Sequence, residues 1–213
     1  MNLLVMGAAG GTGAHLVAQA LAAGHHVTAL ARHPERITTR HERLRVLRAD
    51  ALDRATIDAA LPGHTAVLSA LGATTRARTE VYSQGTANLR RSMTAAGVRR
   101  LVCLSSGALD PGTGTPPAQR LVTRLIIQPL HRHAYADMRR MEDDLATADH
   151  LDWTVVRAPM LTDGPHTGTY RYTHDEDHPL DKPTKISRAD LADFVLDHLD
   201  DQAVFRSRVA ISY

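Results

Sequence analysis

The chain has 213 residues, 43% of them hydrophobic and 23% charged, and a formal net charge of +2 at pH 7. This length fits one domain with its own core, and this composition is typical of a globular protein. The single cysteine excludes an intramolecular disulfide. No apolar run reaches the ~20 residues of a membrane helix, and the arginines are scattered among acidic residues instead of forming a basic stripe, so we expect neither a membrane nor a nucleic acid as a partner.

Short apolar runs alternate with helical patterns along the first half of the chain. We expect strands at residues 2–6, 26–30, 44–47, 65–70 and 101–105, and helices at residues 12–23, 53–61 and 80–96. The first strand uses the residues where a secretory signal would lie, so we expect a cytoplasmic protein. Strands and helices in this order predict parallel βαβ units with right-handed crossovers and helices on both faces. The predicted fold class is α/β, a Rossmann-type doubly wound parallel sheet.

The second half continues this pattern less regularly. A Pro/Gly-rich loop at residues 110–117 leads into helical stretches that reach residue 148, and a sixth strand is expected at residues 153–157. After Pro159 we expect a short strand at 169–172, a helix that begins at Ser187 with Asp190 in a capping-box position, and a last strand at 209–212. We interpret residues 1–213 as one domain, in which residues 158–186 elaborate the substrate side.

A glycine-rich turn joins the first expected strand to the first helix. It reads Gly7-Ala-Ala-Gly10-Gly11-Thr12-Gly13. The first glycine of such a motif permits a tight turn, the second lets backbone N–H groups approach a diphosphate, and the third lets helix and strand pack closely. The N-terminus of the following helix attracts the phosphates. Because this turn opens an α/β alternation, it predicts dinucleotide binding, with a purely structural turn as the alternative.

Residues that follow the second, third and fourth strands indicate which dinucleotide binds. NAD binders usually carry an acid about 20 residues beyond the glycine motif, where it holds the ribose 2′-hydroxyl. This chain has Arg32 there and Arg36 one helical turn later. Guanidinium groups bind a 2′-phosphate but cannot accept a hydroxyl proton, so the expected cofactor is NADP(H), unless both arginines are only surface residues. Asp50 either accepts from the adenine amino group or caps a helix, and further cofactor contacts are expected at Ala51, Leu71 and Gly72.

Segments spread over nearly all of the chain resemble one family, at residues 7–13, 30–32, 50, 67–72, 85–89, 101–106, 151–157, 167–170 and 186–191. They are similar to the atypical short-chain dehydrogenase/reductases of NAD(P)-binding, NmrA-like architecture, and most of all to the biliverdin-IXβ or NADPH flavin reductases among them. This resemblance implies a reductase that passes hydride from NADPH to a flavin, a tetrapyrrole or another flat conjugated acceptor.

The resemblance also implies roles for particular residues. Ser106 matches a serine near the nicotinamide and the acceptor, and Arg32 and Arg36 match the arginines of the 2′-phosphate. A loop that lines the nicotinamide is matched by Pro159, Met160 and Leu161. The biliverdin reductases have a histidine where this chain has Met160, which weakens the tetrapyrrole interpretation more than the fold or the cofactor.

Two residues are candidates for catalysis. Tyr135 and Arg139 keep the spacing of the Tyr-x-x-x-Lys pair of ordinary short-chain dehydrogenases, in which the basic residue lowers the pKa of the tyrosine. Because the lysine is missing, Tyr135 is either a proton donor or a half-buried helix residue. Ser106 follows Ser105 at the end of the fifth strand, where ligands bind in open α/β sheets. Ser106 therefore either contacts the substrate or caps the loop backbone, and Ser105 is expected beside the cofactor.

Arg120 and Arg124 border the loop over this site. They either hold an acidic acceptor by its phosphate or carboxylate, or they are surface charge. None of the thirteen histidines shows a metal-ligand spacing such as H-E-x-x-H, so we expect no metal. Cys103 lies in an apolar strand and is expected in the core.

Three functions fit the sequence. The leading hypothesis is an NADPH-dependent reductase with a flavin as the default acceptor. The second is a reductase or epimerase of the same fold that acts on a specialised metabolite. The third is a non-enzymatic, NmrA-like sensor that binds NADP(H). For the enzymes, a small-molecule acceptor is expected, and the protein is expected to be a monomer or a homodimer.

Overall fold

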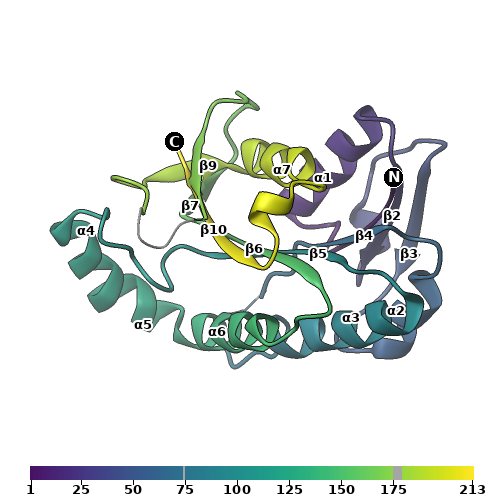
Figure 1. Cartoon of the computed structure of the whole chain (residues 1–213), viewed down its shortest axis with the longest axis horizontal. Helices are drawn as coiled ribbons and strands as arrows, with labels where there is room; N and C mark the ends of the chain where they lie inside the picture. The colour runs from purple at the N-terminus through teal and green to yellow at the C-terminus, as the bar shows by residue number, and fades with distance from the viewer. Residues whose placement is uncertain (74, 175–178) are drawn as a thin grey trace.

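A computed structural model describes residues 1–73, 75–174 and 179–213 of the chain. Its main sheet has eight strands in the order β3-β2-β1-β4-β5-β6-β10-β8 (Figure 1). They are β1 (Asn2–Met6), β2 (His26–Ala31), β3 (Leu44–Arg48), β4 (Ala66–Ser69), β5 (Arg100–Ser106), β6 (Asp152–Ala158), β8 (Arg171–Thr173) and β10 (Ser207–Ser212). Neighbouring strands pair in parallel except β8, which runs antiparallel to β10. The strand order reverses between β1 and β4, the kind of position at which open α/β sheets bind ligands.

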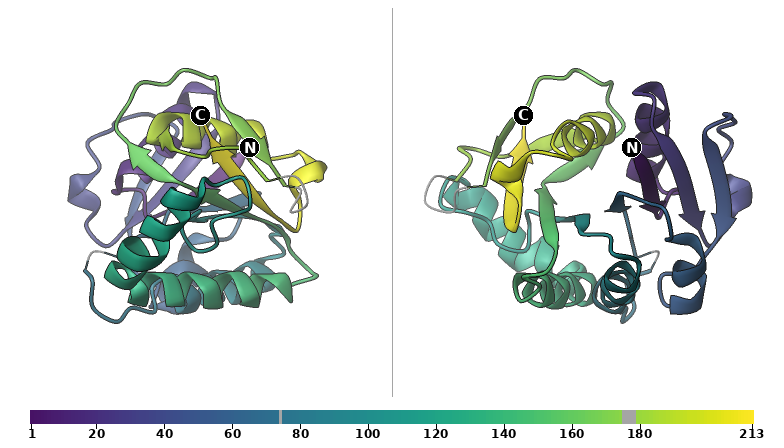
Figure 2. Two further views of the ribbon diagram at one scale, coloured as in Figure 1. Left: turned by 90° about the vertical axis from the view of Figure 1, so that its left-hand side faces the viewer. Right: turned by 45° about the vertical axis from the view of Figure 1, so that its right-hand side comes forward.

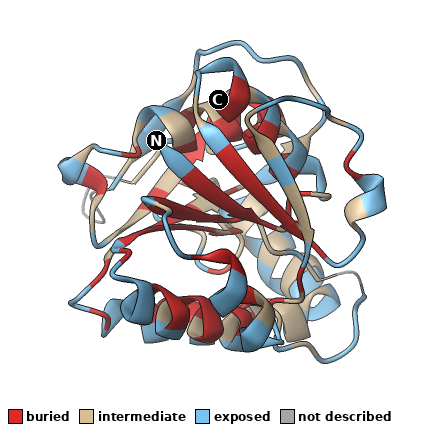
Figure 3. Ribbon diagram, turned by 90° about the vertical axis from the view of Figure 1, so that its right-hand side faces the viewer, coloured by how far each residue is buried: buried red, intermediate tan, exposed pale blue. Residues whose placement is uncertain are grey.

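Helices cover both faces of this sheet (Figure 2). On one face lie α1 (Gly11–Ala22) and α7 (Arg188–Asp197), and on the other lie α2 (Arg54–Ala60), α3 (Ser83–Ala96) and α6 (Arg132–Ala146). Because successive side chains of a strand point to opposite faces, β1 serves both cores. Leu3 and Val5 pack with α1 and α7, whereas Leu4 and Met6 pack with α2, α3 and α6. The central strands are therefore buried on both sides (Figure 3), and the predicted doubly wound fold is confirmed.

The remaining elements lie mostly in the second half of the chain. Between β5 and α6 come α4 (Pro117–Val122), a π-helical turn (Thr123–Ile127) and α5 (Gln128–Leu130). Short 3-10 turns occur at Pro34–Arg36 and Gln202–Val204. A second, two-stranded sheet pairs β7 (Met160–Thr162) with β9 (Lys185–Ser187). Within the described ranges, none of the helices is both long and apolar enough to cross a membrane.

Two sequence-based predictions were wrong in detail. Helix α3 begins at Ser83, not at residue 80, and the expected loop at Pro159, Met160 and Leu161 is partly strand, because Met160 and Leu161 belong to β7. A three-residue strand has no periodicity to detect, and its partner β9 lies far along the chain. The predicted helix start at Ser187 is confirmed, since its Oγ accepts from the backbone N–H of Asp190 at 2.9 Å.

Candidate functional site

The glycine turn forms an anion cradle between β1 and α1. Gly7 has a φ of +81°, and a Cβ added there would lie 2.4 Å from the carbonyl oxygen of Ala70. A Cβ on Gly13 would lie 2.2 Å from the carbonyl oxygen of Gly7, so a side chain is excluded at both positions. Gly10 precedes α1 without any side-chain cap, and the first turn of the helix holds no acidic residue. The open N–H groups of this turn therefore fit the diphosphate of a dinucleotide.

A cavity of about 440 Å³, here called the cofactor cleft, extends from this turn across the ends of β1, β2, β4 and β5. It brings together most of the residues that the sequence marked for cofactor binding: Gly7, Gly10, Gly11, Thr12, Arg32, Arg36, Asp50, Ala51, Leu71, Gly72, Ser105 and Leu161. Gly13 is buried beneath the turn, and Pro159 and Met160 line a different cavity. The lining also includes Tyr82 and Arg188, which the sequence analysis missed.

The polar groups of the cofactor cleft differ in how firmly they are held. Arg32 comes directly after β2 and Arg36 ends the 3-10 turn, and both are exposed. The Asp50 Oδ1 atom accepts from the N–H of Leu52 at 3.0 Å. The alternative role of Asp50 as a helix cap is wrong, because Asp53 caps α2 by accepting from the N–H of Ala55.

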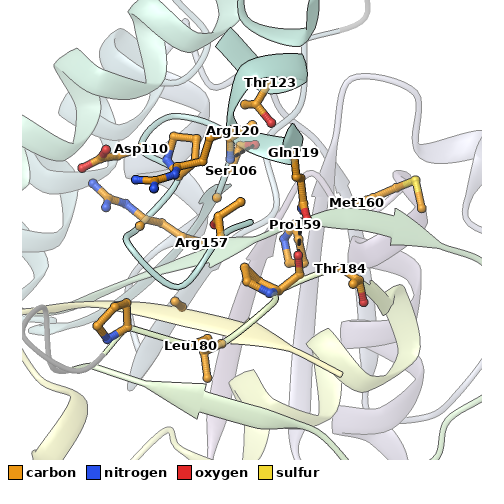
Figure 4. A pocket seen from close by; sticks show the side chains of 18 of the residues that line it. Ser106, Asp110, Gln119, Arg120, Thr123, Arg157, Pro159, Met160, Leu180 and Thr184 are labelled. Carbon is orange, nitrogen blue, oxygen red and sulfur yellow. Dashed lines mark hydrogen bonds between the residues drawn. The ribbon is translucent and has the colours of Figure 1, made fainter. Parts of the chain in front are cut away.

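A second cavity of about 980 Å³, here called the acceptor cavity, lies beyond the end of β5. It is lined by the predicted substrate and catalytic residues Ser106, Arg120, Arg124, Tyr135 and Met160, together with Pro159. Figure 4 shows Ser106, Gln119 and Met160 around this cavity, with Arg157 extending to the same side as Asp110. The loop after β5 is tied to the segment before β9 by hydrogen bonds from Lys182 N–H to Gly114 and from the Gln119 amide to Pro183.

The two cavities adjoin at two pairs of consecutive residues. Ser105 lines the cofactor cleft while Ser106 lines the acceptor cavity, and Leu161 lines the cleft while Met160 lines the acceptor cavity. The two cavities therefore lie next to each other at the ends of β5 and β6.

The candidate catalytic side chains have local partners. Ser106 Oγ accepts from the N–H of Ala108 at 3.2 Å, so it caps the loop backbone while also lining the acceptor cavity. Tyr135 is half-buried on α6, with its ring 5.6 Å from that of His131. The Arg139 guanidinium donates a hydrogen bond to the carbonyl of Leu109, so it stabilises the loop after β5.

A buried ionic cluster beneath both cavities was missed by the sequence analysis. The carboxylate of Glu142 on α6 accepts from Ser105 Oγ at 2.6 Å and from Arg157 on β6 at 2.5 Å, and it pairs with Arg208 on β10 at 3.2 Å. Glu142 is 3% exposed, and the two arginines, which line the acceptor cavity, are 22% and 25% exposed. No local pattern in the sequence predicts this cluster, because its four members come from four different helices and strands.

The surroundings of Cys103 and Tyr82 raise the pKa of both side chains. Burial raises the pKa of the Cys103 thiol to about 12, so this residue belongs to the core, as predicted, and not to a reactive site. Burial also raises the pKa of Tyr82, whose hydroxyl accepts from the N–H of Ala73 at the edge of the cofactor cleft. Over the described part of the chain, histidine, cysteine and carboxylate side chains form no group of three that could hold a metal.

Comparison with known proteins identifies the family. The profile of an NAD(P)H-binding family matches residues 7–202. The chain belongs to this NAD(P)H-binding family. The expected nicotinamide cofactor and the resemblance to an NAD(P)-binding family are thereby confirmed.

Individual relatives of this NAD(P)H-binding protein agree with that assignment. A (4-alkanoyl-5-oxo-2,5-dihydrofuran-3-yl)methyl phosphate reductase of Streptomyces griseus is 35% identical over 156 residues, which are 73% of this chain and 46% of the relative. The match thus spans about half the length of that relative.

Two solved structures share the fold. A wide-type short-chain dehydrogenase/reductase of Veillonella parvula in complex with NADP superimposes with a TM-score of 0.83 at 18% identity, covering 100% of this chain and 94% of that one. An anaerobilin reductase of Escherichia coli O157:H7 superimposes with a TM-score of 0.78 at 21% identity, covering 100% and 97%.

Proposed function

We propose that this protein is an NADPH-dependent reductase that passes hydride to a flavin or a similar flat conjugated acceptor. The observation that carries the proposal is the meeting of the cofactor cleft and the acceptor cavity at Ser105/Ser106 and Leu161/Met160. Bound NADPH supplies the hydride, and the protein supplies position and electrostatics. An acceptor placed against these residues would lie beside the nicotinamide.

The cofactor cleft supports a specific mode of binding. The N–H groups at the start of α1 would hold the diphosphate, and Arg32 and Arg36 would hold the 2′-phosphate, which gives NADPH its advantage over NADH. Asp50 would accept from the adenine. Leu71 and Gly72, after β4, leave room for the dinucleotide to pass, because a Cβ on Gly72 would meet nothing within 4 Å.

The charges of the acceptor cavity favour an acidic acceptor. Arg120 and Arg124 line it together with Arg157 and Arg208, which share the buried Glu142 carboxylate, and Asp110 is the only carboxylate among its described lining residues. A flavin phosphate or another phosphate or carboxylate would find guanidinium partners there. The Streptomyces griseus relative is named as the reductase of a phosphate ester, and the Escherichia coli neighbour as a reductase of anaerobilin. The first of these names is consistent with an acidic acceptor.

Ser106 is the side chain that we place nearest to the reacting atoms, with its hydroxyl at the boundary of the two cavities. It has no neighbouring base in the chain that would make it a nucleophile, so its role is to orient the acceptor. Protons can come from water if the acceptor is a flavin. Tyr135 lines the same cavity and is the second candidate for proton transfer.

The test is NADPH oxidation followed in the presence of FMN, FAD or riboflavin, with a protein-free control. The wild type should consume NADPH faster than the control. Ser106→Ala should lower turnover about tenfold while the affinity for NADPH, measured by calorimetry, stays the same. Cofactor binding without turnover on any acceptor would instead support a sensor that reports NADP(H) to a partner.

A further inference from the structure

Arg188 reaches the cofactor cleft from the C-terminal part of the chain. It is the first residue of α7, directly after the capping residue Ser187, and its side chain is 28% exposed. Its Nη1 atom pairs with Asp163 Oδ1 at 2.5 Å. Asp163 lies just after β7 and its side chain is 87% exposed. The guanidinium thus sits in the cleft while its carboxylate partner sits in solvent.

The stem of Arg188 packs directly on the phosphate-binding turn. A Cβ added to Gly11 would lie 2.7 Å from Arg188 Cδ and 2.8 Å from its Nε. Gly11 is the first residue of α1, whose open N–H groups form the anion cradle. The absence of a side chain at Gly11 therefore makes room for the arginine, which brings a positive charge to the same helix end.

The other two arginines of the cleft come from a different segment of the chain. Arg32 and Arg36 follow β2, where a 2′-phosphate is expected, and neither belongs to the turn. Arg188 is the remaining arginine among the described lining residues. A dinucleotide with phosphates at both places would thus meet a guanidinium at each.

We infer that Arg188 is a diphosphate-binding residue which exchanges its partner when the cofactor binds. In the free protein it pairs with Asp163, and with NADP(H) bound it pairs with the diphosphate. An ion pair with a carboxylate as exposed as Asp163 is weak, so giving it up costs little. Two parallel N–H···O bonds to a phosphate beside a helix N-terminus are stronger. The exchange would release residue 163 and the segment after β7 from the turn.

This assignment predicts a pattern that differs from that of a 2′-phosphate contact. The diphosphate is common to NADP(H) and NAD(H), so the loss of Arg188 should weaken both equally. The inference rests on the dinucleotide site and not on hydride transfer. A protein that bound NADPH but reduced no acceptor would overturn the proposed function and leave this inference standing.

The experiment is calorimetric titration of the full chain with NADP⁺, with NAD⁺ and with adenosine 2′-monophosphate, which lacks a diphosphate. Arg188→Gln should weaken both dinucleotides roughly tenfold and leave the monophosphate unchanged. Asp163→Asn, which removes the competing carboxylate, should strengthen both dinucleotides by a few fold. Arg54→Gln is the matched control, because it breaks an exposed ion pair, with Asp58, outside both cavities.

Unchanged dinucleotide affinity in Arg188→Gln would overturn the inference, as would an equal loss for adenosine 2′-monophosphate, which would indicate a general effect on the site. If Arg188→Gln did not fold, Arg188→Lys would replace it. The lysine keeps the charge but not the bidentate geometry, so it should bind both dinucleotides several-fold more weakly. Wild-type affinity in both Arg188→Lys and Asp163→Asn would then contradict the exchange.

Discussion

The cofactor cleft is lined mostly by residues from the first 105 positions, with the glycine turn among them, whereas the acceptor cavity is lined by residues from 106 onward, with four arginines among them. In the cleft, glycines let the backbone approach the diphosphate, which every nicotinamide dinucleotide contains. In the cavity, arginines and apolar side chains come from loops, helices and the strands β6, β7 and β10. The comparison teaches that the proposed cofactor site is built largely from a local turn, whereas the proposed acceptor site depends on tertiary contacts. Met138, Leu161 and Arg188 are the exceptions, since they reach the cleft from the second half of the chain.

The largest expected effect tests whether the acceptor side depends on its buried charges. Glu142→Gln removes the carboxylate that Arg157 and Arg208 share, and it leaves two guanidinium groups facing each other in a largely buried place. Removing one partner of a buried ionic network typically costs about 3–5 kcal/mol. We expect a loss of this size in the free energy of unfolding, measured by urea denaturation.

The matched control for Glu142 is Asp58→Asn, which breaks the exposed pair between Arg54 and Asp58, 3.2 Å apart. That change should cost less than about 1 kcal/mol. If both variants lost the same small amount, the acceptor side would not depend on its ionic cluster, and the contrast between the two regions would fail.

The next effect tests whether one side chain beside the glycine turn decides which cofactor binds. Arg32→Asp replaces a guanidinium with a carboxylate at the proposed 2′-phosphate position. Losing charge-assisted hydrogen bonds and gaining repulsion should weaken NADPH binding about 100-fold, and NADH binding much less. Titration calorimetry with both cofactors measures the difference.

Arg91→Asp, at an exposed position on α3, makes the same charge change outside both cavities and should leave both affinities near those of the wild type. Equal losses of NADPH and NADH in Arg32→Asp would remove this arginine from the 2′-phosphate site. The preference for NADP(H) would then need another residue.

The smallest effect concerns the anchoring of the segment before β8. Burial disfavours the Asp190 carboxylate, but hydrogen bonds from the Tyr213 hydroxyl and from Thr167 and Gly168 outweigh it and lower the pKa of Asp190 to about 2. Because the pKa in the folded state is below that in the unfolded state, the carboxylate stabilises the fold above about pH 4, and this contribution disappears as the pH falls towards 2. Asp190→Asn should cost about 2 kcal/mol at pH 7 and progressively less below pH 4.

Urea denaturation of the wild type and of Asp190→Asn at pH 7 and at pH 3 measures this dependence. Asp149→Asn, at an exposed position between α6 and β6, should change the free energy of unfolding by less than about 0.5 kcal/mol. A cost for Asp190→Asn that did not change with pH would mean that the residue acts through packing and not through its charge.

How far the sequence predicts this protein differs between the two regions. The strand–glycine turn–helix unit, Arg32 and Asp50 were placed correctly beside one another, because the motif and the ends of parallel strands determine their positions locally. The segment around Pro159, Met160 and Leu161 was expected as one loop at the nicotinamide. The structure makes it partly strand, with Leu161 at the cofactor cleft and Met160 at the acceptor cavity.

Hydrophobic periodicity and the glycine spacing were sufficient to establish the α/β order and the cofactor class, because these depend on residues a few positions apart. The pairing of β7 with β9, the Glu142 cluster and the position of Arg188 on the turn depend on side chains from distant segments. Such contacts leave no local period in the amino-acid order. They form only when packing of α6 and α7 on opposite faces of the sheet brings those segments together.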